Sequence, residues 1–430
     1  MAKYLIKGCA VIPISGPVIE NGAIAISDDR LEYVGSLAEL PPDWQQQETI
    51  AAADMIALPG LVNSHTHAGM TLLRSYADDL PLQQWLEEKI WPREDQLERE
   101  DIYWGTKLAL LEMIRSGTTT FADMYFHMDS VAEAVVAAGL RASLSQGLIG
   151  LQDDSKERLA TGISLVKEWQ GAGDGRITTM LGPHAPYTCT PQYLQKVVDA
   201  AAALNVGLHI HLAETQEEVA NVSKLYGATP VVLVDQLGLF ELPVLAAHCV
   251  HLTSEEIAIL ALKKVGVAHC PESNLKLASG VAPVPAMLAA GVRVAIGTDS
   301  AASNNNLDMV AEMRTAALLA KGVSTDPTTV PASQALTMAT LHGAMALGLD
   351  REIGTLEAGK KADLILIKRR QPHLMPCHDL EANLVYAARG SDVDTVIVNG
   401  KILMAGGDFK TLDAEKIYAE VDKRIKKFYN

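Results

Sequence analysis

Imidazoles and carboxylates gather directly after apolar segments at several points of this 430-residue chain. The first group is His65-Thr66-His67, which follows the apolar run from Ile56 to Val62. Residues two apart in a strand point to the same side, so both rings are expected to face one space. Neutral imidazole is a good ligand for zinc. The spacing therefore indicates a metal site, although a His-x-His pair also occurs as an ordinary polar strand end.

Further groups of the same kind strengthen this interpretation. His209 and His211 end a second apolar segment, His248 and His251 end the next one, and Asp299 follows the last. An explanation without a metal would need each of them to be a separately satisfied polar group in the core. A divalent metal with an open position lowers the pKa of a bound water to about 7, which makes hydrolysis the chemistry to expect.

The elements that must position these residues form a repeating pattern of short apolar strands and helical stretches. Such alternation predicts a parallel sheet in an α/β fold, and eight units over about 250 residues match a (β/α)8 TIM-like barrel. Residues after each strand would then meet at the carboxyl end of the barrel, where barrel active sites lie. The predicted strands are residues 56–63, 118–124, 141–148, 177–183, 206–212, 245–250, 266–269 and 292–297.

The two ends of the chain show short strands and turns instead of this alternation. We expect them to combine into one small β-sandwich domain, and we expect the last stretch, residues 414–428, to be an amphipathic helix. The predicted domains are residues 1–57 for the first part of the sandwich, 58–356 for the metal-dependent barrel, and 357–430 for the second part with the C-terminal helix.

Two segments resemble the amidohydrolase superfamily. Residues 58–67, which read LPGLVNSHTH, resemble its strand-one motif, and residues 354–364, which read GTLEAGKKADL, resemble its return to the β domain. The resemblance covers essentially the whole chain. It implies metal ligation by His65, His67, His211 and Asp299, with His248 beside the metal-bound water.

The same resemblance bears on the number and kind of metal ions. Some members of the superfamily bind two metals through a carboxylated lysine at the end of strand four. Here that region reads Gly182-Pro183-His184 and contains no lysine, so we expect one divalent metal per chain. Histidine and carboxylate ligands suit Zn²⁺, Fe²⁺ or Mn²⁺, and the resemblance favours Zn²⁺.

Glu214 adds a proton-transfer group to the expected metal site. It lies three residues after His211, where a carboxyl group can protonate a departing nitrogen. Asp299 can accept the proton of the attacking water, and His248 can steady the developing oxyanion. The arrangement resembles the aminohydrolase branch of the superfamily, which acts on purines and related rings.

Finer motifs resemble the deaminases of 5′-methylthioadenosine and S-adenosylhomocysteine. These motifs are residues 68–74 (AGMTLLR), 79–86 (DLPLQQWL) and 90–94 (IWPRE). The resemblance implies that Trp85 packs near the adenine or the sulfur substituent and that Glu94 binds the ribose hydroxyls. It also implies that His184 contacts the ribose and that Arg158 reaches the far end of the substrate. Trp85 could equally serve helix packing, and Glu94 and Arg158 could be surface charges.

One departure from this pattern concerns the substrate tail. Some relatives carry an arginine immediately before the Gly-Leu that ends strand three, whereas this chain has Gln146. The missing charge weakens the case for a strongly anionic tail and favours 5′-methylthioadenosine or 5′-deoxyadenosine over S-adenosylhomocysteine. The expected activity is hydrolytic deamination at C6 of an adenosine-type nucleoside, which yields an inosine analogue and ammonia.

Two other functions stay open at this stage. One is another ring hydrolase of the superfamily, acting on guanine, an oxidised purine or a chlorinated triazine, for which a ribose-binding Glu94 would have no use. The other is a catalytically inactive scaffold of the same fold, although such a protein should have lost ligands that this chain keeps.

Composition narrows the partners and the compartment. A formal net charge of −16 argues against binding nucleic acid, because such a surface repels phosphates. Five scattered cysteines without a Cys-x-x-Cys pair, and a start that lacks signal-peptide features, favour a reduced, cytoplasmic setting. No apolar run approaches a membrane span. Apolar barrels of this kind often associate, so a homo-oligomer is compatible with the sequence.

Overall fold

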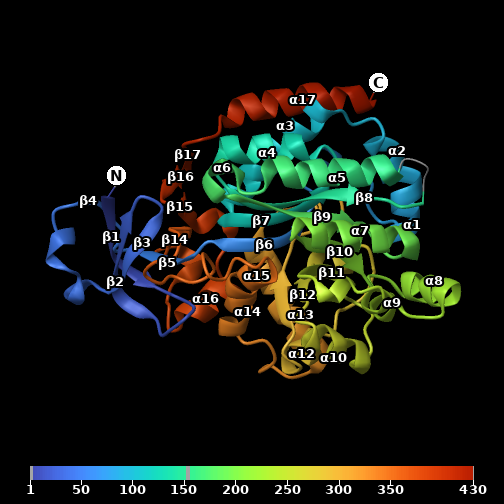
Figure 1. Cartoon of the computed structure of the whole chain (residues 1–430). Helices are drawn as coiled ribbons and strands as arrows, with labels where there is room; N and C mark the ends of the chain where they lie inside the picture. Colours follow the sequence, from blue (N-terminus) through green and yellow to red (C-terminus); the bar gives the residue numbers. More distant parts are fainter. Residues whose placement is uncertain (1–2, 152–154, 430) are drawn as a thin grey trace.

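Two sheets organise the computed structural model, which describes residues 3–151 and 155–429. One is an almost closed parallel barrel, and the other is a sheet assembled from both ends of the chain (Figure 1). The predicted fold class is therefore confirmed. Within the described residues the barrel has eight strands, in chain order: β6 (Leu61–Thr66), β7 (Thr118–Tyr125), β8 (Arg141–Leu148), β9 (Ile177–Pro183), β10 (Gly207–Leu212), β11 (Val244–His248), β12 (Gly266–His269) and β13 (Arg293–Ile296).

Helices follow the barrel strands and cover the outside of the barrel (Figure 1). Their apolar sides pack on the strands, whose residues are almost all buried. The helices are α3 (Arg99–Arg115), α4 (Met128–Ala138), α5 (Ser155–Trp169), α7 (Pro191–Leu204), α8 (Gln216–Tyr226), α9 (Pro230–Gln236), α10 (Ser254–Leu262), α11 (Pro271–Lys276), α12 (Val284–Ala289), α13 (Met309–Ser324), α14 (Ala332–Ala339) and α15 (Leu341–Ala346).

Local sequence sets where several of these helices begin and end. The side chain of Thr215 accepts a hydrogen bond from the main chain at the start of α8, and Gly227 ends that helix with a left-handed φ of 72°. At the start of α10, Thr253 and Glu256 form a reciprocal capping box. Such caps satisfy main-chain groups that have no partner within the helix. They keep the strand-end loops that carry site residues short and ordered.

Contacts between the first and last strands close the barrel. The main-chain N–H of Asp299 donates to the carbonyl of His65 at 2.9 Å, and the hydroxyl of Ser64 donates to the carbonyl of Ile296 at 2.8 Å. The side chains of Asn63 and Thr298 add a hydrogen bond of 2.7 Å. These contacts bring the two predicted metal-binding segments side by side, although 234 positions (299 − 65) separate Asp299 from His65.

The second sheet has nine strands within the described part of the chain. Its order is β17-β16-β15-β14-β5-β1-β2-β3, with β4 paired to β1. The neighbours β14 and β5 come from opposite ends of the sequence, which confirms the discontinuous β domain. The strands are β1 (Lys3–Val11), β2 (Ile19–Ser27), β3 (Arg30–Ser36), β4 (Glu48–Ala51), β5 (Met55–Pro59), β14 (Leu364–Lys368), β15 (Val393–Val398), β16 (Lys401–Ala405) and β17 (Asp408–Phe409).

The prediction of one strand over residues 56–63 is wrong. The chain passes there from the terminal sheet to the barrel, as β5 and then β6, and changes sheet at Gly60. A Cβ atom at Gly60 would lie 2.0 Å from the hydroxyl of Thr119, so only glycine fits this crossing. Both strands are buried and apolar, which is why a continuous apolar run did not reveal the change. The predicted domain limits at residues 57 and 356 stay predictions.

The C-terminal helix α17 (Ala414–Tyr429) lies along α3 on the barrel, across the top of Figure 1. Its Arg424 is buried and forms ion pairs with Glu100 at 2.5 Å and with Asp101 at 3.4 Å. The helix therefore fastens the end of the chain to the barrel rather than to the terminal sheet. The remaining short helices are α1 (Leu82–Gln84), η4 (Trp85–Ile90), α2 (Trp91–Glu94), α6 (Ala172–Gly175), α16 (Leu380–Tyr386) and the turns η1 (Leu37–Glu39), η2 (Pro42–Trp44), η3 (Ala68–Leu73), η5 (Leu239–Glu241), η6 (Pro372–Leu374) and η7 (Gly390–Asp392).

Among the described helices, none combines the length and the apolar composition needed to cross a bilayer.

Candidate active site

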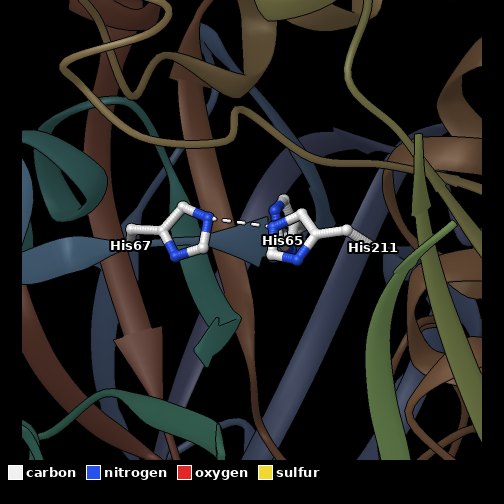
Figure 2. A group of neighbouring side chains, drawn as sticks. All are labelled: His65, His67 and His211. Carbon is white, nitrogen blue, oxygen red and sulfur yellow. Dashed lines mark hydrogen bonds between the residues drawn. The ribbon is translucent and has the colours of Figure 1, made fainter. Parts of the chain in front are cut away.

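Three histidines meet at the carboxyl end of the barrel. His65 and His67 come from the end of β6 and His211 from β10, and one ring nitrogen of each lies within 4.8 Å of the others (Figure 2). The Nε2 atoms of His67 and His211 are 3.3 Å apart. Asp299, just after β13, brings its Oδ1 to 3.4 Å from His65 Nε2 and 3.3 Å from His67 Nε2. The four side chains predicted as metal ligands therefore converge on one point.

The outer nitrogens of these rings are held by the surrounding main chain. His67 Nδ1 donates to the carbonyl of Met124, and His211 Nδ1 donates to the carbonyl of His184 at 2.9 Å. A carbonyl oxygen only accepts, so each ring carries a proton on Nδ1, and in the neutral form of the ring the lone pair lies on Nε2. Both lone pairs therefore face the common centre, which is the arrangement that a metal ligand needs.

The environment of His65 Nε2 indicates whether a metal ion fits this group of side chains. Its Nε2 is buried and has no hydrogen-bond partner among the described residues. Buried polar atoms are nearly always paired, so an unpartnered nitrogen aimed at two other nitrogens and a carboxylate needs an explanation. Three imidazoles and one carboxylate are the ligand chemistry of zinc and similar divalent metals. The donor set fits such an ion.

Two serines orient the carboxylate of Asp299. The hydroxyls of Ser273 and Ser303 donate to its Oδ2 at 2.6 and 2.9 Å, which leaves Oδ1 toward the histidines. Burial raises the pKa of Asp299, but its interactions with His65 and His67 outweigh burial and hold that pKa well below its usual range. Asp299 is therefore ionised and can ligate a cation.

Glu214 and His248 face each other beside this centre. Glu214 Oε2 lies 3.7 Å from His248 Nε2, and the hydroxyl of Ser279 donates to Glu214 Oε1 at 3.1 Å. Burial raises the pKa of Glu214, and the charge of His248 opposes that rise. A carboxyl group with a raised pKa next to a metal-binding centre is suited to proton transfer near neutral pH.

Further contacts fix the positions of these two groups. The carboxylate of Glu218 accepts hydrogen bonds from the main-chain N–H groups of Ala213 and Glu214, at 3.0 and 2.8 Å. His248 Nδ1 is 2.9 Å from the side-chain oxygen of Asn274. Both His248 and Asp299 adopt left-handed backbone angles, with φ of 72° and 59°. Such angles are uncommon outside glycine and concentrate at functional sites.

The residues predicted to bind substrate lie around the same cavity. Trp85, Glu94 and His184 line the inner cavity together with three of the predicted metal ligands, which are His67, His211 and Asp299. Trp85 is buried and donates its indole N–H to the carbonyl of Ala77 at 3.0 Å. Burial lowers the pKa of His184 to about 3, so this ring is neutral. The structure thus brings two segments that are distant in sequence, residues 85–94 and the loop at His184, to the centre; their contacts with a substrate stay predictions.

Glu94 connects this inner cavity to an outer one. The outer cavity has a volume of about 850 Å³, which lies in the range of small-molecule sites. Glu94 lines both cavities, and the hydroxyl of Tyr125 donates to its Oε1 at 2.7 Å. Burial raises the pKa of Glu94, while the hydrogen bond from Tyr125 opposes the rise.

Arg158 lies in the outer cavity and not among the residues that line the inner one. Its guanidinium stands 5.7 Å from the ring centre of Phe126, and Gln146 lines the same cavity. Arg158 can therefore contact only a part of a ligand that extends away from the metal centre. The position agrees with a tail-binding role and gives no evidence for contact with the reacting atoms.

The sequence did not predict the side chains that orient the candidate metal ligands and proton-transfer residues. Ser273, Ser279, Ser303, Asn274 and Tyr125 have residue types that occur throughout the chain, and their spacing carries no recognisable signal. Only the fold brings them within hydrogen-bond distance of the metal-binding and proton-transfer residues.

Comparison with known proteins gives consistent results. The model of the amidohydrolase family matches residues 56–403. The chain is 78% identical to 5-methylthioadenosine/S-adenosylhomocysteine deaminase of Moorella thermoacetica, over 99% of this chain and all of the relative. A crystal structure of an adenosine deaminase from Xanthomonas campestris with bound zinc has a TM-score of 0.94 at 38% identity, and 99% of each chain is covered. An atrazine chlorohydrolase from Arthrobacter aurescens complexed with zinc has a TM-score of 0.91 at 27% identity, with 98% of this chain and 100% of that chain covered.

Proposed function

Because the chain belongs to the amidohydrolase family, we propose that it is a metal-dependent aminohydrolase acting on the cyclic amidine of adenine in 5′-modified adenosines. The reaction replaces the 6-amino group with oxygen from water and releases ammonia, so adenosine analogues become inosine analogues. The candidate substrates are 5′-methylthioadenosine, S-adenosylhomocysteine, 5′-deoxyadenosine and adenosine. The main support is the presence of a buried carboxyl group, Glu214, within one cavity that is also lined by three of the four proposed metal ligands, His67, His211 and Asp299.

We assign metal binding to His65, His67, His211 and Asp299, and we favour a single zinc ion. When bound, the ion would polarise a water molecule and lower its pKa, so that a nucleophile is available near neutral pH. The chemistry of the donors and the unpartnered His65 Nε2 support this assignment. Fe²⁺ and Mn²⁺ are compatible with the same donors.

Glu214 moves the protons of the reaction in this proposal. In its protonated form, Glu214 donates from its carboxyl group to a nitrogen of the adenine ring, which makes C6 more electrophilic. Asp299 accepts a proton from the attacking water, and His248 steadies the charge that develops on the oxygen. The 3.7 Å approach of His248 Nε2 to Glu214 Oε2 supports their action on one reacting group.

The remaining predicted residues position the nucleoside. Glu94 accepts hydrogen bonds from the ribose hydroxyls, His184 contacts the ribose, and Trp85 packs beside the base or the sulfur substituent. Arg158 faces the 5′ substituent in the outer cavity. Gln146, which is neutral, lines that cavity too and favours an uncharged substituent over an anionic one.

We further propose a cytoplasmic protein that acts on a small-molecule nucleoside without binding nucleic acid. The acidic net charge and the scattered cysteines support this setting. A homo-oligomer is compatible with the apolar barrel. The domain limits at residues 57 and 356 belong to the same proposal.

A substrate panel tests the proposal. Purified, zinc-loaded protein is assayed for ammonia release with the four adenosines, guanine and a chlorinated triazine. We expect release from the adenosines, and ammonia release or dechlorination with only the other rings would refute the assignment. Glu94→Ala further distinguishes a nucleoside deaminase from a hydrolase of free rings, because it should impair turnover of nucleosides but not turnover of a ring without ribose.

A further inference from the structure

His209 is a buried histidine at the metal centre that none of the roles above uses. It is the first residue of the His209-Ile210-His211 segment on β10 and is completely buried. Its Nε2 lies 2.8 Å from His65 Nδ1, and its own Nδ1 lies 3.5 Å from the hydroxyl of Ser145. The rings of His65 and His209 meet edge to face, with centres 5.0 Å apart.

This contact distinguishes His65 from the other two histidine ligands. His67 and His211 each donate from Nδ1 to a main-chain carbonyl, and a carbonyl can only accept. Their Nδ1 protons are therefore fixed on the side away from the centre, so in the neutral rings the Nε2 lone pairs face it. The partner of His65 Nδ1 is an imidazole nitrogen, which can donate or accept. The tautomer of His65 is thus set by the tautomer of His209.

We propose that His209 is a positioning residue that holds His65 in the tautomer required for metal binding. In that state His65 Nδ1–H donates to His209 Nε2, His209 Nδ1–H donates to Ser145 Oγ, and the His65 Nε2 lone pair faces the metal. The inference rests on the metal site of the proposed function but not on its substrate.

The opposite arrangement is also available to the same groups. His209 Nε2–H can donate to His65 Nδ1, and His65 Nε2–H then points at Asp299 Oδ1, which is 3.4 Å away. Each ring carries one proton in both states, so the two arrangements differ only in where these protons lie. The second arrangement blocks His65 as a ligand. Metal binding and the direction of the His65–His209 hydrogen bond are therefore coupled.

Substitutions at His209 test this coupling through metal affinity. His209→Leu removes the acceptor, whereas the side-chain carbonyl of His209→Gln can replace it. Zinc dissociation constants are measured by competition with a chromophoric chelator. We expect affinity to fall about 10- to 100-fold in His209→Leu, the range found when such supporting contacts are lost, and much less in His209→Gln.

His269 provides a matched control on β12, which is separated from β10 by β11 in the barrel. It is also buried, and its Nδ1 has no hydrogen-bond partner among the described residues. His269→Gln should leave zinc affinity unchanged. Equal zinc affinity in folded His209→Leu and in the native protein would overturn the proposal, as would an equal loss in His209→Gln and His209→Leu.

Nitrogen NMR on the native protein tests the proposal without any substitution. In zinc-loaded protein with ¹⁵N-labelled histidine, we expect His65 to carry its proton on Nδ1 and His209 to have an unprotonated Nε2. A protonated His209 Nε2 in the zinc-loaded state would overturn the proposal. These outcomes are separate from the substrate panel, since a chain that binds zinc in this way could still fail to deaminate adenosines.

Discussion

Replacing Glu214 by glutamine removes the proposed proton donor and little else. The amide oxygen of Gln at position 214 can still accept the hydrogen bond from Ser279, which is 3.1 Å in the native protein. The bonds from the main chain at Ala213 and Glu214 to Glu218 do not involve the substituted group. Folding and metal content should therefore be preserved.

The expected loss follows from the role of the carboxyl group. General acid–base catalysis by one positioned side chain contributes about 10²- to 10⁴-fold, which corresponds to about 2.7–5.5 kcal/mol of transition-state stabilisation. Burial raises the pKa of Glu214, which increases the fraction of the protonated form that the reaction needs. We expect kcat to decrease by this factor and KM to change little.

The assay follows ammonia release from the best adenosine of the panel by native protein and E214Q, each with its zinc content measured. Glu217→Gln serves as a matched control, because Glu217 lies on the exposed side of α8. A decrease of less than about tenfold in E214Q with full metal content would refute the assigned role, since one factor of ten is only 1.4 kcal/mol.

Four further predictions concern pH, substrate binding, metal and stability. Deamination by the native protein should decrease as pH rises through the raised pKa of Glu214, because the protonated form is the donor, and a pH–rate profile without a basic limb would contradict this. Glu94→Gln should raise KM for nucleosides about 10- to 100-fold with a smaller effect on kcat, as expected for loss of charge-assisted hydrogen bonds; unchanged KM would refute ribose binding. Chelation should lower the melting temperature and added zinc should restore it, since free metal at 1,000 times its Kd stabilises by about 4.1 kcal/mol; a melting curve insensitive to both would argue against a resident metal. Arg141→Met should lower the free energy of unfolding in urea by about 3–5 kcal/mol, because it leaves buried Asp363, 2.8 Å from Arg141 Nε, without its partner; R141M/D363L should recover part of the loss, and a loss below about 1 kcal/mol would contradict this account.

The proposed metal ligands could be predicted from sequence because their signals are local. His65 and His67 are two residues apart at the end of an apolar strand, and Asp299 follows another such strand. Strand periodicity and the rule that barrel sites lie at the carboxyl ends of strands were enough to predict that they meet. The same reasoning predicted three barrel strands, β8, β9 and β12, with the bounds that the structure shows.

Other features were beyond local reasoning. The run that contains β5 and β6 reads as one strand, because both are buried and apolar, and only the packing of Gly60 against Thr119 reveals the change of sheet. The strand predicted over residues 245–250 ends in the structure at His248, two residues before the predicted end. His248 and Cys249 adopt left-handed backbone angles at this point, and the residue types give no indication of these angles.

Sequence alone thus predicted the class of fold and a group of histidines and carboxylates at the strand ends, and the resemblance to the amidohydrolase superfamily selected the proposed metal ligands from that group. The fold class and the positions of the candidate residues follow from residue types and from periods of two and of about 3.6 residues, which are properties of neighbouring positions. Tertiary structure decided which groups orient them: serines on Asp299, carbonyls on His67 and His211, and His209 on His65. Apart from Ser303, which lies 4 positions from Asp299, those partners lie between 26 and 144 positions from the residues that they hold, and hydrogen bonding across such distances depends on how the strands form the barrel.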